Sequence, residues 1–156
     1  MIGVRITGAA AMHEAASRAL FEEEVAKLRP ELLESRGWTL FSKNFPVLDV
    51  GFTAKDGARL RMRLLCDDWN ERPPSVQFQD WEGRPLASIE RDPGSVFNNS
   101  PHPSTGKPFV CMQGVREYHT HPSHSNDAWA AIRGGDRFTL GGILTQLWHV
   151  WRSLHK

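Results

Sequence analysis

The segment from Arg59 to Cys66 constrains the fold more than any other, because apolar and basic residues alternate along it without a break. This period of two is typical of a β-strand with one face toward a core and one face toward water. The apolar face consists of four residues: Leu60, Met62, Leu64 and Cys66. The Asp56-Gly57 dipeptide before this segment is typical of a tight hairpin. The chain is therefore expected to contain an antiparallel sheet with one basic, solvated face.

Helices are predicted on both sides of the strand region. Within residues 11–35, one helical face carries Phe21, Val25, Leu28 and Leu32. Pro30 either kinks this helix or starts a second short helix, and Gly37 is expected to end the segment. Residues 138–154 predict a C-terminal amphipathic helix. Residues 1–10 are expected to form a flexible segment or a first strand.

The order of the predicted elements defines the fold class. A helix is followed by about four antiparallel strands, a long proline-rich loop over 82–110 that leads to a thiol, a polar loop over 118–136, and a final helix. That order is α+β. A length of 156 residues fits a single domain over 1–156.

Charge and composition exclude several classes of partner. Lys and Arg number 19 against 18 Asp and Glu, so the formal charge is only +1 and favours neither nucleic acid nor an anionic membrane as the main partner. No apolar run approaches the roughly 20 residues of a membrane span, and the N-terminus is a poor secretory signal. The two cysteines are interpreted as reduced thiols in a cytoplasmic protein.

Cys111 is the first candidate for chemistry. It follows the proline-rich loop and lies outside any strong strand pattern, so its thiol is expected to be accessible. The alternative is that Cys111 is packed as a small hydrophobic residue. Cys66 continues the apolar face of the strand and is expected to be structural.

A histidine cluster is the second candidate. His119, His121 and His124 lie close together in the polar loop, and Asp127 follows them. Two imidazoles at i and i+2 of an extended segment point to the same side, so His119 and His121 could share a zinc ion with His124, Asp127 or Cys111. The alternative is a solvated polar loop. The sequence His119-Thr120-His121-Pro122 also resembles part of the JAMM metalloprotease signature, although Asp127 lies too close and Asp136 too far for the aspartate of that signature.

A third constellation extends over most of the chain. It consists of Pro73-Pro74 before a short strand, Pro101-His102-Pro103-Ser104, Cys111, and the helix over 138–154. With the order of elements from about residue 11 to 154, it resembles the ubiquitin-conjugating (UBC) family. Ser104 stands where that family has the Asn of His-Pro-Asn. The last two helices of the typical family member are absent, as they are in the short bacterial members that this sequence resembles most.

The resemblance implies a UBC-like fold and a transferase in which Cys111 forms a thioester with a ubiquitin-like modifier and passes it to an amine. The implied partners are the modifier, an activating enzyme and a target protein, with antiphage defence as a setting and no cofactor or metal. His119, His121 or Asp127 would orient or deprotonate the amine. Ser104 or a backbone N–H near Cys111 would serve the oxyanion, and His102 would anchor the loop.

Two other functions stay open at this point. One is a zinc-dependent hydrolase or zinc-binding domain that uses His119, His121 and His124. The other is a non-catalytic UBC-like binding module in which Cys111 is merely packed. Thiol accessibility and the geometry of the histidines distinguish the three hypotheses.

Overall fold

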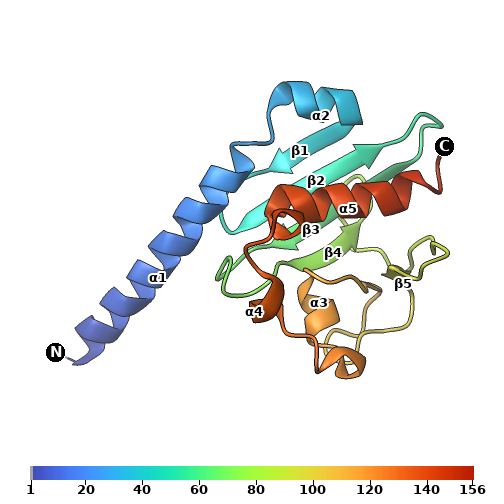
Figure 1. The fold of residues 1–156 in the computed structure, drawn as a ribbon. Coiled ribbons are helices and arrows are strands. Elements are labelled where there is room, and N and C mark those ends of the chain that lie inside the picture. The colour runs from blue at the N-terminus through green and yellow to red at the C-terminus, as the bar shows by residue number, and fades with distance from the viewer. Residues whose placement is uncertain (1) are drawn as a thin grey trace.

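The computed structural model describes the backbone of residues 2–156 and the side chains of residues 13–156. The fold is α+β, as predicted, and Figure 1 shows the order of its elements. The helices and strands are α1 (Ile2–Val25), α2 (Pro30–Arg36), β1 (Trp38–Ser42), β2 (Val47–Thr53), β3 (Arg59–Leu65), β4 (Ser75–Gln79), β5 (Phe97–Asn98), β6 (Phe109–Val110), α3 (Arg116–His119), η1 (Pro122–His124), α4 (Trp129–Ile132), η2 (Asp136–Phe138) and α5 (Leu140–Arg152), where η marks a 3₁₀-helix.

The central sheet is the predicted four-stranded antiparallel meander, in the order β1-β2-β3-β4. In the middle of the sheet, Met62 of β3 pairs with Val50 of β2 and with Phe78 of β4. The predicted hairpin joins β2 to β3, and Gly57 adopts a positive φ of 89° in it. The apolar side chains of β3 are buried on the face that α5 covers (Figure 1).

The N-terminal helical region corrects one sequence prediction, at residues 2–10, and confirms one of the two alternatives at Pro30, a second short helix that starts there. Helix α1 begins at Ile2, so residues 2–10 belong to a helix and not to a flexible segment or a first strand. The predicted helix over 11–35 is divided in two, because α1 ends at Val25 and α2 begins with Pro30 at its first position. Proline suits that position because its missing N–H would be unpaired there anyway. Gly37 ends α2 with φ 69°, as predicted.

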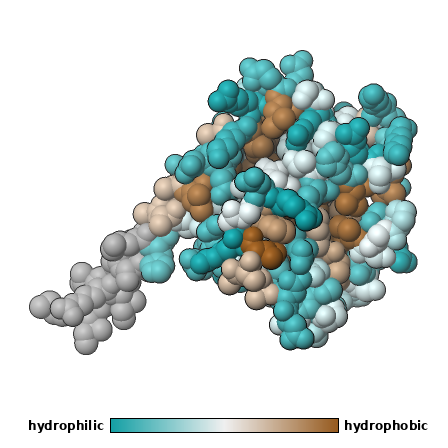
Figure 2. Space-filling view, in the orientation of Figure 1, coloured by the Kyte–Doolittle hydropathy of each residue, from teal (hydrophilic) through white to brown (hydrophobic). Residues whose placement is uncertain are grey.

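The C-terminal helix α5 supplies much of the core. Thr139 caps its first turn by accepting a hydrogen bond from the N–H of Gly142. Its buried face consists of Leu140, Ile143, Leu144, Leu147 and Trp151. Figure 2 shows that hydrophilic residues cover most of the face in view, with smaller hydrophobic patches between them. Within residues 2–156, no helix combines the length and hydropathy that crossing a bilayer requires.

The side chain of Glu24 connects three parts of the chain by hydrogen bonds inside this core. Its carboxylate accepts a hydrogen bond from the N–H of Leu140 at 2.7 Å and another from Nε1 of Trp69 at 2.8 Å. Burial raises the pKa of Glu24. Because a buried donor left unpaired is costly, this carboxylate holds α1, the segment after β3 and the start of α5 in one arrangement.

The proline-rich loop is ordered by its own side chains. The side-chain amide of Asn99 makes two hydrogen bonds to the backbone of Ile89. Its oxygen accepts from the N–H of Ile89, and its nitrogen donates to the carbonyl oxygen of Ile89, each at 2.7 Å. Asp92 accepts from the N–H of Phe97. The loop then returns through β5 and β6, which pair antiparallel and lead directly to Cys111.

Candidate active site

Cys111 lies at the exit of the short strand β6. Its backbone N–H donates to the carbonyl oxygen of Val96 at 2.7 Å, which fixes the start of the segment that follows. The residue is half-buried, and this partial burial raises the pKa of the thiol. Sγ lies 3.5 Å from Nε2 of His124, within the range of a hydrogen bond to sulfur. The residue is therefore partly exposed, and an imidazole lies beside its sulfur.

His124 ends the 3₁₀-helix η1, and a neighbouring aromatic ring fixes its orientation. The imidazole stacks on the ring of Tyr118 with a centroid separation of 3.9 Å and an interplanar angle of 18°. This stack directs Nε2 toward Cys111. A neutral imidazole can accept a thiol proton there, because its ordinary pKa lies near neutrality.

Tyr118 is held in turn by a carboxylate. Its hydroxyl donates to Oδ2 of Asp127 at 2.6 Å, and Nε2 of Gln113 donates to the same oxygen at 2.8 Å. The hydrogen bond to Asp127 raises the pKa of Tyr118 to about 12, since a phenolate would repel the carboxylate. Donation from Tyr118 and Gln113 lowers the pKa of Asp127. At neutral pH the pair is thus a phenol donating to a carboxylate.

His119 has a different role from the one predicted for it. Its Nε2 accepts from the N–H of Gly114 at 3.0 Å, and its Nδ1 lies 2.9 Å from the carbonyl oxygen of Asp127. Because Nε2 accepts, this network assigns the proton to Nδ1. Both ring nitrogens contact backbone groups, so His119 positions the loop and does not face the thiol.

His121 also turns away from the thiol chemistry predicted for it. Nδ1 accepts from the N–H of Ser123 at 3.1 Å and lies 2.7 Å from Oγ of the same serine. The ring stacks on Phe109 with a centroid separation of 5.6 Å. Among the three histidines of the polar loop, the structure therefore brings His124 to Cys111, and not His119 or His121.

Both ring nitrogens of His102 contact backbone groups of the loop and of α3. The residue is 1% exposed; Nδ1 accepts from the N–H of Ser104 at 3.0 Å, and Nε2 lies 2.8 Å from the carbonyl oxygen of Glu117. The ring also packs edge-on against Phe109. Ser104 uses its backbone in this contact and has an exposed side chain, so an oxyanion role for its hydroxyl has no support in the arrangement.

Several residues of the site carry no signal in the sequence alone. Glu117 is buried in α3, where its carboxylate accepts from Oγ of Ser75 and from the N–H of Val76 and so ties α3 to β4. Gln113 and Tyr118 hold Asp127. Tyr118 is the single tyrosine of the chain, which could have drawn attention to it, but nothing indicated its partners.

The positions of the predicted zinc ligands are a further feature of the site. Within the described residues, no group of three or more His, Cys, Asp and Glu is arranged to hold a metal ion. His119 has both ring nitrogens engaged by backbone groups, and Nδ1 of His121 is engaged by Ser123. The predicted ligands are therefore dispersed among separate contacts.

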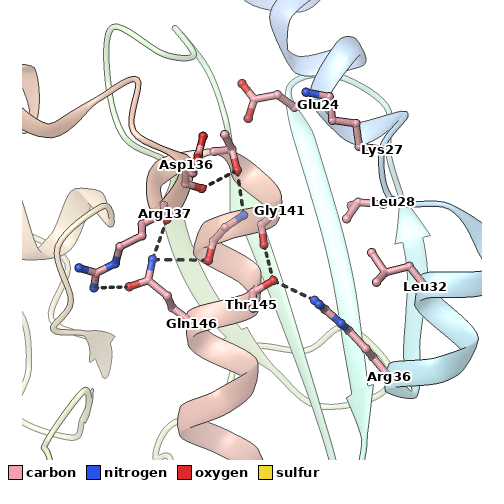
Figure 3. A pocket seen from close by; sticks show the side chains of 12 residues that line it. Glu24, Lys27, Leu28, Leu32, Arg36, Asp136, Arg137, Gly141, Thr145 and Gln146 are labelled. Carbon is pink, nitrogen blue, oxygen red and sulfur yellow. Dashed lines mark hydrogen bonds between the residues drawn. The ribbon is translucent and has the colours of Figure 1, made fainter.

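Two larger hollows lie apart from the thiol. The first, of about 550 Å³, is bounded by α1, α2 and α5, and Figure 3 shows Leu28 and Leu32 facing Gly141 and Thr145 across it. The second, of about 600 Å³, lies at the C-terminal end of α5. Neither includes Cys111 among its lining residues.

Fold and site together define a small α+β protein with a cysteine–histidine pair at the end of a loop anchored by a buried histidine. Residues 95–152 match the Y4jH-like family, described as the Y4jH family. The chain is also 49% identical to a protein named "Uncharacterized protein y4jH" from Sinorhizobium fredii (strain NBRC 101917 / NGR234), over 84% of this chain and 80% of that protein. The chain belongs to the Y4jH-like family. The matched segment contains Cys111, His124 and their supporting residues.

Proposed function

We propose that this protein is a ubiquitin-conjugating-like acyltransferase, in which Cys111 carries the C-terminal carbonyl of a ubiquitin-like modifier as a thioester and passes it to an amine. One observation carries the proposal: the half-buried Sγ of Cys111 lies 3.5 Å from Nε2 of His124. A thiol becomes a nucleophile as the thiolate, and an adjacent imidazole is a common means of forming it.

The order of elements supports the proposal. A helix, a four-stranded meander, a Pro73-Pro74 segment, a loop with a buried His102, a cysteine and a covering helix follow one another as in the UBC family that the sequence resembles. The buried His102 supports it further, because a rigid loop is what a shallow acyl-binding site needs. A modifier, an activating enzyme and a target protein with an acceptor amine would be the partners.

The first chemical step would be thioester exchange. Nε2 of His124 takes the proton of the Cys111 thiol, and the thiolate attacks the carbonyl carbon of the incoming thioester. The new C–S bond forms, the C–S bond to the donor thiol breaks, and the departing thiolate recovers a proton from the imidazolium. Since one thioester replaces another, the step is close to neutral in energy.

The second step would be aminolysis. The acceptor amine must lose a proton, form a C–N bond with the carbonyl carbon and expel the Cys111 thiolate. Both hydrogen bonds to Asp127 end at Oδ2, which leaves Oδ1 to accept a hydrogen bond from the neutral acceptor amine. His124 would then take the proton of the amine as the C–S bond breaks, and the proton would return to the thiolate.

A peptide thioester ending in Gly-Gly tests both steps without the natural partners. At neutral pH, the wild-type chain should gain one acyl group that excess dithiothreitol removes by thiol exchange, and added lysine should convert this group into an amide. Cys111→Ala should gain none. Cys111→Ser should form an oxyester that survives the added thiol.

Matched variants separate this proposal from the alternatives. His124→Gln should slow acylation, and His121→Gln should leave it nearly unchanged, because His121 bonds to Ser123 and not to the thiol. A thiol-labile adduct that persists in Cys111→Ala would refute the assignment of the nucleophile. A wild-type chain that gains no acyl group would favour the non-catalytic module.

A further inference from the structure

A second cluster of charged side chains lies at the C-terminal end of α5, apart from Cys111. The hollow of about 600 Å³ there is bounded by the end of α2, the hairpin between β2 and β3, and the last turn of α5. Its lining includes four basic residues, Arg36, Lys55, Arg152 and Lys156, together with His155. None of its lining residues is Asp or Glu. Its volume is in the range of small-molecule sites.

The indole of Trp148 contacts two of these cations. The guanidinium of Arg36 lies 5.0 Å from the centre of one of the indole rings, and that of Arg152 lies 4.5 Å from it. Nη1 of Arg36 also donates to Oγ1 of Thr145 at 2.9 Å. Two guanidinium groups thus contact one indole side chain, and that of Arg36 also lies 5.1 Å from the centre of a ring of Trp38.

These cations differ from Arg61 and Arg84, two arginines that have carboxylate partners. Arg61 pairs with Asp49 at 2.8 Å, and Arg84 pairs with Asp80 at 2.7 Å. Among the ion pairs of the described residues, none includes Arg36, Lys55 or Arg152. The side chains of Arg36, Lys55 and Arg152 are therefore not paired with a carboxylate in the part of the chain that the structure describes.

Two carboxylates beside the hollow are engaged by His155. Nδ1 of His155 lies 3.0 Å from Oδ2 of Asp56, and Nε2 lies 2.9 Å from Oε2 of Glu90. Asp56 also accepts from the N–H of Ala58 through Oδ1. The last turn of α5 is closed by further backbone bonds, since the N–H of Ser153 donates to the carbonyl of His149. Neither feature supplies a counterion to Arg36 or Arg152.

We propose that this hollow binds a small, multiply charged phosphate ligand, through the guanidinium groups of Arg36 and Arg152 and the ammonium of Lys55. Arginine forks match the spacing of phosphate oxygens, and the stack on Trp148 reduces the rotamer freedom that binding would remove. Three cations that line one hollow favour a ligand that carries two or more negative charges. The site is independent of Cys111 and of the acyl transfer proposed above.

Inorganic pyrophosphate titrated into the full chain at fixed ionic strength tests this proposal by calorimetry and by the indole N–H signals in NMR. Saturable binding should appear, with the largest indole shift at Trp148. Arg152→Gln should weaken binding about tenfold or more, as expected for a lost charge-assisted hydrogen bond. Lys55→Gln should weaken pyrophosphate binding by a smaller factor, because Lys55 lies on an exposed hairpin and not on the indole of Trp148. Arg84→Gln, which removes a cation paired with Asp80, is the matched control and should leave the affinity unchanged.

Three results would overturn the proposal. The first is the absence of saturable binding by the wild-type chain. The second is equal weakening by Arg84→Gln and Arg152→Gln, which would indicate attraction by net charge alone. The third is binding of citrate as tight as that of pyrophosphate, which would show that the hollow does not select phosphate. Far-UV circular dichroism of each variant confirms that the fold is retained.

Discussion

The two cysteines of this chain have different surroundings. Cys66 continues the buried face of β3; it is 0% exposed, and its Sγ lies 3.6 Å from the carbonyl oxygen of Leu64. Burial raises the pKa of this thiol far above its usual range. Cys111 is half-buried, and burial raises its pKa too, but Nε2 of His124 lies within reach of its sulfur. Desolvation alone keeps a thiol protonated, whereas access and an adjacent base allow it to react.

The histidines near Cys111 repeat this contrast. His102 and His119 use both ring nitrogens in contacts that order the backbone. His124 instead directs Nε2 at a sulfur atom. A histidine engaged by backbone groups on both sides stabilises a loop, and His124 is the histidine whose Nε2 lies beside the Cys111 sulfur. The predictions below test these contrasts.

The largest effect is expected from exchanging the two thiols for alanine. Cys111→Ala should abolish acylation by a peptide thioester and change the free energy of unfolding by less than about 0.5 kcal/mol, because the side chain is half-buried. Cys66→Ala should keep acylation and destabilise the fold by about 1 kcal/mol through the small cavity it leaves. Intact mass and urea denaturation measure the two quantities. The opposite pattern would reverse the roles assigned to the two sulfurs.

His102→Ala should destabilise the protein by about 2–4 kcal/mol, because it removes a buried ring and leaves the N–H of Ser104 and the carbonyl of Glu117 without their partner. Ser104→Ala should cost less than about 0.5 kcal/mol, since its exposed side chain does not make this contact. Urea denaturation compares them. Equal stability of the two variants would mean that His102 is not the anchor of the loop.

His124→Gln should lower the rate at which iodoacetamide alkylates Cys111 by about tenfold at neutral pH, since the thiol loses its proton acceptor. His121→Gln should stay within about twofold, because its imidazole bonds to Ser123. The pH profile gives a second readout. In His124→Gln the rate should keep rising with pH through the raised pKa of the thiol. Identical profiles for wild type and variant would exclude the thiol–imidazole pair.

The smallest effect is expected in the ultraviolet titration of Tyr118. Tyr118 is the only tyrosine, and its pKa of about 12 predicts little phenolate absorbance at about pH 11, where an ordinary tyrosine is mostly ionised. The folded state holds this proton more tightly than the unfolded chain does, so stability is lost as pH rises through about 10 to 12. Asp127→Asn should move the ultraviolet titration toward pH 10. Circular dichroism at the same pH values verifies folding, and an ordinary titration in the wild type would contradict the hydrogen bond.

Sequence patterns predicted the frame of the molecule well. Alternation along β3, the Asp56-Gly57 turn and the helical face of α5 depend on local periodicity and on burial, which are visible in one dimension. The break at Pro30 and the end at Gly37 depend on backbone chemistry of single residues. The start of α1 was missed, because the Ala-rich N-terminal segment has no strong apolar period.

The site was predicted only in part. Cys111 and His102 stood out by residue type and by their spacing within a resemblance. Which of the three nearby histidines lies beside Cys111 depends on how the chain turns between α3 and η1. That turn stacks His124 on Tyr118, whereas His119 contacts the backbone N–H of Gly114. Contacts set by three-dimensional turns leave no period in the sequence. The supporting roles of Gln113 and Glu117 were invisible for the same reason.

Alkylation of the two thiols in the folded protein is the most direct test of the central claim, that Cys111 is a reachable nucleophile and Cys66 is not. Iodoacetamide at neutral pH, followed by peptide mass mapping, should modify Cys111 readily and reach Cys66 only after the chain is unfolded with denaturant. If Cys111 is protected in the folded protein to the same extent as Cys66, the sulfur is sealed and the acyltransferase proposal fails.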